Sequence, residues 1–335
     1  MIRMKQSEGL FYKMKKYKER VHLLLSLIKN YYVDCKLFYK HSNIFKQDTF
    51  GKIEALIILR YHSLEKGFLH DSIRYEFGKN VVIELAKLLK REDVIANCNR
   101  SQITAAYMVM CNYYTAHSEK NVDISSYYPK SDFDFFSNML ALNFLSVNDQ
   151  QATSYFDNSD KDFYHFSKSR CSMRDFTGEM VSFETIEKVI EIAKTAPSVC
   201  NRQPVKVYFV EDKKIIDSVF AIQKGLKGYS DNVSQLFVVV SNRNYFYKVG
   251  ERSQLFIDGG IFVMNLLYAL HYYKIGACPA HWGFNTDTDQ QIKKLLNMKE
   301  AEKVICLVPI GIPQNKFKTT LSLRRSNDEI LKRIT

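Results

Sequence analysis

The sequence predicts an α+β protein in which a helical N-terminal region precedes a domain with a mixed β-sheet flanked by helices. Up to about residue 120, apolar residues recur at spacings of three and four, as they do on one face of a helix. After residue 160, helix-like and strand-like segments alternate. Residues 118–162 are rich in Tyr, Ser, Asn and Asp. We therefore expect a helical extension with a connecting region over 1–160, and a second domain over 161–335.

The N-terminal region is strongly basic. Residues 1–50 contain 11 Lys and Arg against 4 Asp and Glu, which is more than half of the net charge of +12. The run Tyr12–Arg20 is interpreted as a solvated helix face, with peripheral contact to an anionic membrane surface as the alternative. No nucleic-acid partner is expected, because aromatic-basic repeats and zinc-finger spacings are absent from the sequence.

Several features of the sequence favour a cytoplasmic protein. The apolar run Val21–Ile28 is too short to span a bilayer and lacks a small-residue cleavage site. The 7 cysteines are scattered without a C-x-x-C pair, which is typical of reduced thiols. The 8 histidines form no His or Cys cluster, so no protein-bound metal is expected.

The elements expected after residue 160 follow from caps, breakers and apolar spacing. Ser182 is the predicted N-cap of a helix that Pro197 prevents from continuing. The other expected elements are a strand over 205–210, a strand over 236–241 buried on both faces, a central helix over 256–276 that stops at Gly276, a helix capped by Asp287 that runs to Leu296, and a buried strand over 304–312.

The sequence lacks the common glycine motifs for phosphate binding and acyl transfer. Neither G-x-G-x-x-G nor G-x-x-x-x-G-K-[ST] nor G-x-S-x-G occurs. A phosphorylated cofactor would therefore have to be held by side chains. Arg170, Ser172 and Arg174 are spaced by two, so in an extended segment they would project from the same side and could hold a phosphate. The alternative is a surface strand with two salt-bridged arginines.

A second polar segment follows the predicted helix. In "APSVCNRQP", the helix break at Pro197 would expose Ser198, Asn201 and Gln203 to a planar polar ligand. With "RCSMRDF", "IGACPAHWGF" and the C-terminal "LRRSNDEI", this segment resembles the flavin-dependent nitroreductase family over residues 163 to about 330. The resemblance rests most on the spacing of Pro197, Ser198, Asn201, Gln203 and Pro204.

The resemblance implies FMN as cofactor. Arg170 and Ser172 would hold its phosphate and ribityl chain, and Arg174 would approach flavin N1 and O2, where a cation stabilises the reduced ring. The loop with Ser198 and Asn201 would lie beside the isoalloxazine. At the C-terminus, where the family often has Lys-x-Arg, this chain keeps only the arginine.

That C-terminal departure leaves one ligand position open. Arg324 matches the arginine of the Lys-x-Arg pattern. Ser322 stands in the position of the lysine, and Arg325 is the candidate to compensate for the missing lysine.

The segment that should face flavin N5 also departs from the family. The segment consists of Pro279, Ala280, His281, Trp282 and Gly283, and which of its backbone N–H groups donates is open. His281 is either a satisfied structural histidine or a group acting on substrate. Trp282 is either a packing residue or a flap over the flavin. No catalytic side chain is assigned with certainty, because flavin N5 itself would carry the chemistry. Cys171 and Cys200 are interpreted as small fillers rather than nucleophiles.

The extension contains its own compact motif, "YHSLEKGF" over 61–68. His62, Glu65 and Lys66 share one helix face, where Glu–His or Glu–Lys pairing is the simplest interpretation. The stretch resembles an H-x-L-E-K-G segment in a nitroreductase-like subgroup associated with surface-polysaccharide gene clusters, although these residues specify no sugar substrate.

The resemblance implies an oxidoreductase that passes hydride or electrons from NADH or NADPH through FMN to an electron-poor or conjugated small molecule. It also implies a homodimer with FMN at the subunit interface. The alternatives are an FMN-holding but non-catalytic partner- or membrane-binding module, and a specialised reaction such as dehalogenation, dehydrogenation or flavin breakdown. The acceptor, its pathway and the choice between NADH and NADPH are not specified by the sequence.

Overall fold

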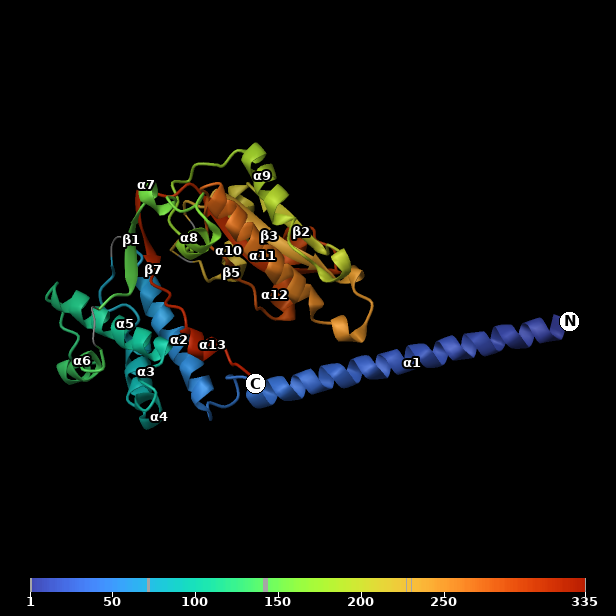
Figure 1. Cartoon of the computed structure of the whole chain (residues 1–335), viewed down its shortest axis with the longest axis horizontal. Coiled ribbons are helices and arrows are strands. Elements are labelled where there is room, and N and C mark those ends of the chain that lie inside the picture. The colour runs from blue at the N-terminus through green and yellow to red at the C-terminus, as the bar shows by residue number, and fades with distance from the viewer. Residues whose placement is uncertain (1, 71–72, 141–143, 227, 230, 335) are drawn as a thin grey trace.

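The computed structural model describes residues 2–70, 73–140, 144–226, 228–229 and 231–334. Its N-terminal half is mainly helical, as expected (Figure 1). The elements there are α1 (Ile2–His41), α2 (Phe50–Gly67), α3 (Lys79–Leu89), α4 (Glu92–Ile95), α5 (Ser101–Ser118), α6 (Lys130–Ser137), β1 (Val147–Gln151), α7 (Ala152–Tyr155) and α8 (Phe163–Ser169).

Helix α1 extends away from the rest of the chain (Figure 1). It contains the basic run Tyr12–Arg20, whose side chains are exposed, as expected for a solvated helix face. It touches the second domain through Asp34, whose Oδ2 lies 2.6 Å from Nε of Arg252. Large apolar side chains such as Leu24 and Tyr32 are also exposed along α1.

Helices α2 to α6 share a hydrophobic core of their own. Helix α2 packs on α3 and α5, and it buries Ile53, Ile57 and Leu64 almost completely. The apolar spacing in the sequence identified this face, because residues three and four apart lie on the same side of a helix.

The second domain contains the predicted sheet. Its elements are α9 (Phe183–Ala193), η1 (Val199–Asn201), β2 (Val205–Val210), α10 (Lys213–Gln223), β3 (Gln235–Asn242), η2 (Arg243–Tyr245), η3 (Val249–Glu251), α11 (Gln254–Tyr272), β4 (Gly276–Ala277), β5 (Ala280–His281), α12 (Thr286–Leu295), β6 (Glu302–Gly311), β7 (Lys316–Thr320) and α13 (Asn327–Ile330). The α+β class is confirmed.

The sheet order is β2-β3-β6-β4, with β5 also paired to β6. Every one of these pairings between described residues is antiparallel, so the expectation of a mixed sheet was wrong. An apolar strand buried on both faces is typical of a parallel sheet but also occurs in an antiparallel sheet covered on both sides. The composition of a strand does not reveal the direction of its partner.

Strand β3 is buried on both faces, as predicted. Alternate residues such as Phe237 and Val239 pack with α9 and α11, whereas Val238 and Val240 pack with α10 and α12. Among the described residues, α11 is the one helix long and apolar enough to cross a membrane by length and composition. It packs against β3 and α9, as the core helix of this domain.

Two predicted helix ends were wrong. Helix α11 ends at Tyr272 and is followed by Lys274 with a φ of +59°, so Gly276 does not terminate it. Gly276 lies in β4, where a Cβ would come 2.2 Å from Sδ of Met173. Close packing is therefore the reason for this glycine. Helix α12 is capped by Asn285, whose side chain accepts from the N–H of Thr288, rather than by Asp287.

A small second sheet joins the chain's centre to its end. Strands β1 and β7 pair antiparallel, Val147 with Thr320 and Gln151 with Lys316, and the sequence pattern did not predict β1. From β7 the chain runs back to the N-terminal helices, where α13 lies beside α2 (Figure 1). We call residues 321–330 the C-terminal arm.

Candidate functional site

The Arg-x-Ser-x-Arg segment is extended and follows α8. The N–H of Met173 donates to the carbonyl of Ala277 in β4 (2.9 Å), and the Met173 side chain is fully buried. Arg170, Ser172 and Arg174 alternate with it and are half-buried. The Tyr155 hydroxyl holds the segment from the other side, since it accepts from the N–H of Cys171 and donates to the carbonyl of Cys171.

Both arginines of this segment have buried nitrogen atoms without a hydrogen-bond partner. These atoms are Nε and Nη1 of Arg170 and Nη1 of Arg174. Neither side chain takes part in an ion pair with a described residue, so the alternative of two salt-bridged surface arginines has no support among the described residues. Because buried donors are nearly always satisfied in folded proteins, these nitrogens fit an anionic ligand such as a phosphate.

The positive charge of Arg170 affects the pKa of a buried histidine. His271 of α11 is buried, and its Nε2 lies 2.8 Å from the hydroxyl of Ser169. Burial, and to a smaller extent the positive charge of Arg170, lower the pKa of His271 to about 4. His271 is therefore neutral at pH 7 and leaves the positive charge of the site to the arginines.

Arg324 is the free arginine of the C-terminal arm. Its Nη1 donates to the carbonyl of Ser322 (3.3 Å), and its side chain is exposed. It also acts on Cys171, whose pKa is raised by burial and lowered in part by Arg170 and Arg324. Arg170 and Arg324, which the sequence analysis assigned to one phosphate site, therefore both lie near Cys171.

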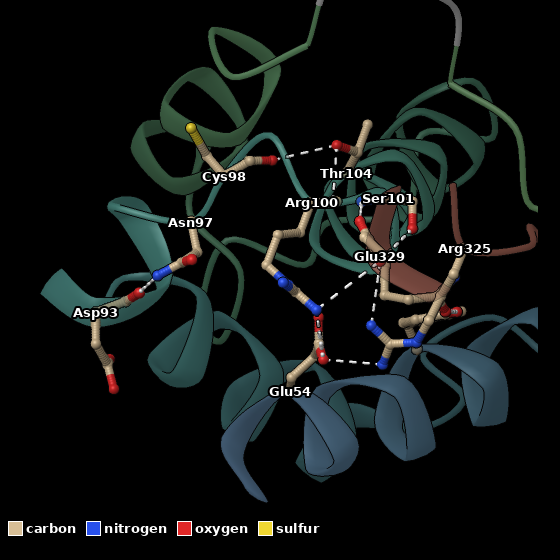
Figure 2. A network of polar contacts seen from close by, with 11 residues as sticks. Glu54, Asp93, Asn97, Cys98, Arg100, Ser101, Thr104, Arg325 and Glu329 are labelled. Atoms are coloured by element: carbon tan, nitrogen blue, oxygen red, sulfur yellow. Dashed lines mark hydrogen bonds and ion pairs between the residues drawn. The ribbon is translucent and has the colours of Figure 1, made fainter. Parts of the chain in front are cut away.

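Arg325 is committed elsewhere. Its Nη2 donates to Oε2 of Glu54 (2.8 Å) and its Nη1 to Oε2 of Glu329 (3.1 Å). Figure 2 shows these residues together with Arg100, which donates to both oxygens of Glu54. Arg325 thus ties the C-terminal arm to α2 and is not positioned as a substitute for the missing lysine.

The loop after α9 is a strained polar turn. Cys200, Asn201 and Gln203 have φ values of +50°, +53° and +47°, a conformation that costs free energy for residues with a Cβ and is concentrated at functional sites. The Ser198 hydroxyl accepts from the N–H of Gln203 (2.9 Å) and stabilises the turn. The exposed Cys200 is not buried as a filler would be.

Helix α11 anchors this loop. Both carboxylate oxygens of Asp258 accept from the N–H of Val199 at 3.4 Å. The next residue, Gly259, is packed so closely that a Cβ would lie 2.7 Å from Ile305. A pocket of about 150 Å³ lies here, lined by Pro197, Ser198, Gln203, Asp258 and Phe262 among others.

The segment expected to face flavin N5 follows β4. Trp282 is buried in the core and its Nε1 donates to Asp289 (2.8 Å), which favours the packing interpretation over a flap. His281 is exposed, and its carbonyl accepts from Nε2 of Gln223 (3.3 Å). Gly283 is pressed against the His281 ring, since a Cβ would come 2.3 Å from His281 Nε2.

The single chain does not unite all the expected site residues. Arg170, Arg174 and Arg324 gather near Cys171 and Cys278. The loop with Ser198 lines a separate pocket, and no hydrogen bond between described residues joins the loop to the arginine segment. Among the described residues, no group of three or more His, Cys, Asp and Glu could hold a metal.

The structure adds residues that sequence reasoning did not assign to the site. A pocket of about 180 Å³ beside Arg174 is lined by Leu69 and His70 from the extension and by Tyr229. The His70 and Tyr229 rings are stacked with centroids 4.5 Å apart. The only signal in the sequence was the H-x-L-E-K-G motif, which ends just before Leu69.

The fold and site together define an α+β domain in which buried nitrogens of Arg170 and Arg174 have no hydrogen-bond partner among the described residues, as suits a phosphorylated ligand. Comparison with known families places the domain more closely. The sequence model of the nitroreductase family matches residues 168–235 and 223–312 of this chain. The match does not include the N-terminal extension.

Several individual proteins are also similar to part of this chain. An iodotyrosine deiodinase of Nematostella vectensis is 23% identical over an alignment 209 positions long, which covers 51% of this chain and 74% of the deiodinase. A Desulfovibrio desulfuricans protein described as a nitroreductase, solved in complex with FMN, is 22% identical, with 52% of this chain and 98% of that chain covered and a TM-score of 0.44. A nitroreductase family protein of Clostridium novyi is 25% identical, with 46% and 86% covered and a TM-score of 0.40.

Proposed function

We propose that this protein is an FMN-dependent oxidoreductase that takes hydride from NADH or NADPH and reduces an electron-poor or conjugated small molecule. The observation that carries the proposal is the set of buried guanidinium nitrogens of Arg170 and Arg174 that have no hydrogen-bond partner. They lie in the part of the chain that matches the nitroreductase family. A phosphate monoester supplies the acceptor oxygens that such donors bind.

The residues of the chain would bind and orient the cofactor. Arg170, Ser172 and Arg324 would hold the phosphate, and Arg174 would place a positive charge beside the pyrimidine edge of the ring. When bound, FMN supplies a ring that accepts and donates hydride. Ser198 and Asn201 would offer hydroxyl and amide groups to the ring edge. Ala280 to Gly283, which include the short strand β5 paired to β6, would provide backbone N–H donors, and Pro279 precedes them.

A homodimer would complete this site. The Ser198 loop and the arginine segment line different pockets of one chain. Helix α11 exposes Phe256, Ile257, Ile261 and Met264 to solvent. A second copy packed on this apolar face would bring its own Ser198 loop to the arginines, and this arrangement would bury the exposed side chains. A cytoplasmic location is part of the same proposal. It is supported by the 7 cysteines, which are all free thiols.

The first test is the absorbance spectrum of the purified protein and the identity of the chromophore released on denaturation. We expect FMN near one per chain, and NADH- or NADPH-dependent reduction of a quinone or nitroaromatic. Arg170→Ala should weaken FMN binding by about 10- to 100-fold, because a hydrogen bond to a charged group contributes ~1.5–3 kcal/mol. Arg333→Ala is the matched control, since Arg333 is exposed. No FMN bound at excess cofactor would refute the proposal.

Reductive dehalogenation is a second candidate reaction. The relative from Nematostella vectensis is described as an iodotyrosine deiodinase and aligns with 51% of this chain. Release of iodide from iodinated tyrosine by the reduced, FMN-loaded protein would support it. A link to surface polysaccharides rests only on the H-x-L-E-K-G resemblance, and a sugar-nucleotide acceptor belongs in the same screen.

Two non-catalytic alternatives remain as outcomes of these tests. FMN bound without turnover of any acceptor would indicate a flavin-holding partner module. The exposed basic and apolar side chains of α1 would serve a peripheral membrane protein. That alternative predicts salt-sensitive binding to anionic liposomes, which deletion of residues 1–30 abolishes.

A further inference from the structure

The H-x-L-E-K-G motif forms the last turn of α2, and that turn is fixed from three sides. Nδ1 of His62 lies 2.8 Å from Oε2 of Glu65, so the predicted Glu–His pair is present. The buried Glu65 also accepts from the N–H of Ser322 in the C-terminal arm (3.3 Å). The Tyr229 hydroxyl donates to the carbonyl of Lys66. The backbone of Lys66 is therefore held between the C-terminal arm and residue 229.

Close packing determines how the turn ends. Gly67 faces the Phe77 ring, and a Cβ there would lie 2.1 Å from it. The chain then continues into Leu69 and His70, which line the pocket beside Arg174 together with Tyr229. The motif thus positions the end of α2 at the edge of the proposed flavin site.

Lys66 contributes a positive charge to this edge. Its side chain is half-buried and forms no ion pair or hydrogen bond with a described residue, so it is not the partner of Glu65. Burial lowers the pKa of Lys66, and the charge of Arg174 lowers it further. Tyr229, whose hydroxyl donates to the carbonyl of Lys66, lines the same pocket as Arg174. The pKa of the buried Cys278, raised by burial and lowered in part by Arg174, Lys66 and Arg170, agrees with this placement.

Placing cations together in a half-buried region is unfavourable unless an anion is bound between them. Each loses hydration, and like charges repel more strongly where water is excluded. Arg174 keeps a buried nitrogen without a partner at this place. The contacts of Glu65 with the C-terminal arm and of Lys66 with Tyr229 nevertheless hold the end of α2 in place. The arrangement is therefore suited to an anionic ligand that Lys66 and Arg174 share.

We propose that Lys66 is a cofactor-binding residue, which extends from the N-terminal domain to bound FMN beside Arg174, so that the flavin site is built from both domains. The inference rests on the proposed function. It assigns a role to the extension, which lies outside the part of the chain that matches the family. A second cation at the flavin would bind the reduced, more negative ring more tightly than the oxidised ring.

The test compares Lys66→Met, Lys66→Arg and Lys87→Met in the full chain. Lys87 is an exposed lysine of α3 and serves as the matched control. Each apoprotein is titrated with FMN, and the quenching of flavin fluorescence during the titration gives the dissociation constant. We expect Lys66→Met to weaken binding at least about tenfold, Lys66→Arg to retain most of the affinity, and Lys87→Met to match the wild type.

The midpoint potential of the bound flavin is the second readout. If the reduced form loses tenfold more affinity than the oxidised form, the two-electron potential falls by about 30 mV in Lys66→Met. Unchanged affinity and potential in a Lys66→Met protein with wild-type unfolding temperature would overturn the role of Lys66 while FMN binding by the wild type stands. A wild type that binds no FMN would instead refute the proposed function itself.

Discussion

Replacing Glu54 by glutamine should destabilise the protein and loosen the C-terminal arm. Glu54 is 4% exposed and accepts three hydrogen bonds, from Arg100 Nε (2.7 Å), Arg100 Nη2 (3.3 Å) and Arg325 Nη2 (2.8 Å) (Figure 2). Breaking a buried ion pair by removing one partner costs about 3–5 kcal/mol. The two arginine side chains are 34% and 31% exposed and regain hydration, so we expect a loss of ~2 kcal/mol.

Urea unfolding of the apoprotein measures this loss. Glu84→Gln is the control, because Glu84 forms a comparable pair with Arg60 (2.7 Å) but its side chain is 40% exposed. Pairs at the surface contribute about 0–1 kcal/mol. Glu54→Gln should therefore shift the unfolding midpoint clearly more than Glu84→Gln does. Equal shifts for the two variants would show that the network of Figure 2 does not hold the arm, and the reasoning would be refuted.

The same carboxylate predicts a pH dependence. Burial raises the pKa of Glu54, but hydrogen bonds from Arg325 and Arg100 outweigh it and hold the pKa below the usual 4.5. A group whose pKa is lower in the folded state stabilises that state above its unfolded pKa and loses this effect as the pH falls. The stability difference between wild type and Glu54→Gln should be constant above pH 4.5 and shrink below it.

FMN affinity should also fall in Glu54→Gln. Glu54 holds Arg325, and Arg325 is the neighbour in sequence of Arg324, the proposed phosphate ligand.

Two further predictions concern buried groups near the site. Because His271 has a pKa of about 4 when folded and 6.5 when unfolded, the unfolded chain takes up its proton first. The free energy of unfolding should fall by up to ~3 kcal/mol between pH 6.5 and 4, and His271→Gln should lose this slope in urea titrations at several pH values. Gly276→Ala places a Cβ 2.2 Å from Sδ of the buried Met173 and should lower stability by ~1–3 kcal/mol in thermal unfolding. Gly51→Ala in α2 has nothing within 4 Å of its Cβ, and should be neutral or slightly stabilising; destabilisation of both variants alike would contradict the packing argument.

Local pattern identified the elements whose identity depends on neighbours in the chain. The spacing of apolar residues predicted the helix that Ser182 caps, and the cap is present, with the Ser182 hydroxyl accepting from the N–H of Thr185. The strand over 205–210 has these bounds in the structure. Such predictions succeed because caps, helix faces and strand alternation involve residues within a few positions of one another.

The errors came from contacts between distant residues. Gly276 was interpreted as a helix terminator, but its role is set by Met173, about a hundred positions earlier in the chain. The direction of strand pairing and the pairing of β1 with β7 were likewise invisible, because hydrogen bonds between strands leave no period in either strand's sequence.

The sequence alone determined the class of the fold and the residue types available for a phosphorylated cofactor. Only the tertiary structure decided which of those residues are free to bind it. Adjacent arginines separated in this way: Arg325 is paired with Glu54 and Glu329, whereas Arg324 is in no ion pair with a described residue. Of the two pairings that the sequence allowed for Glu65, the structure has the one with His62, and Lys66 forms no ion pair with a described residue. Charge and hydrogen-bonding capacity belong to a residue, but its partner is chosen by the packing of segments far apart in sequence.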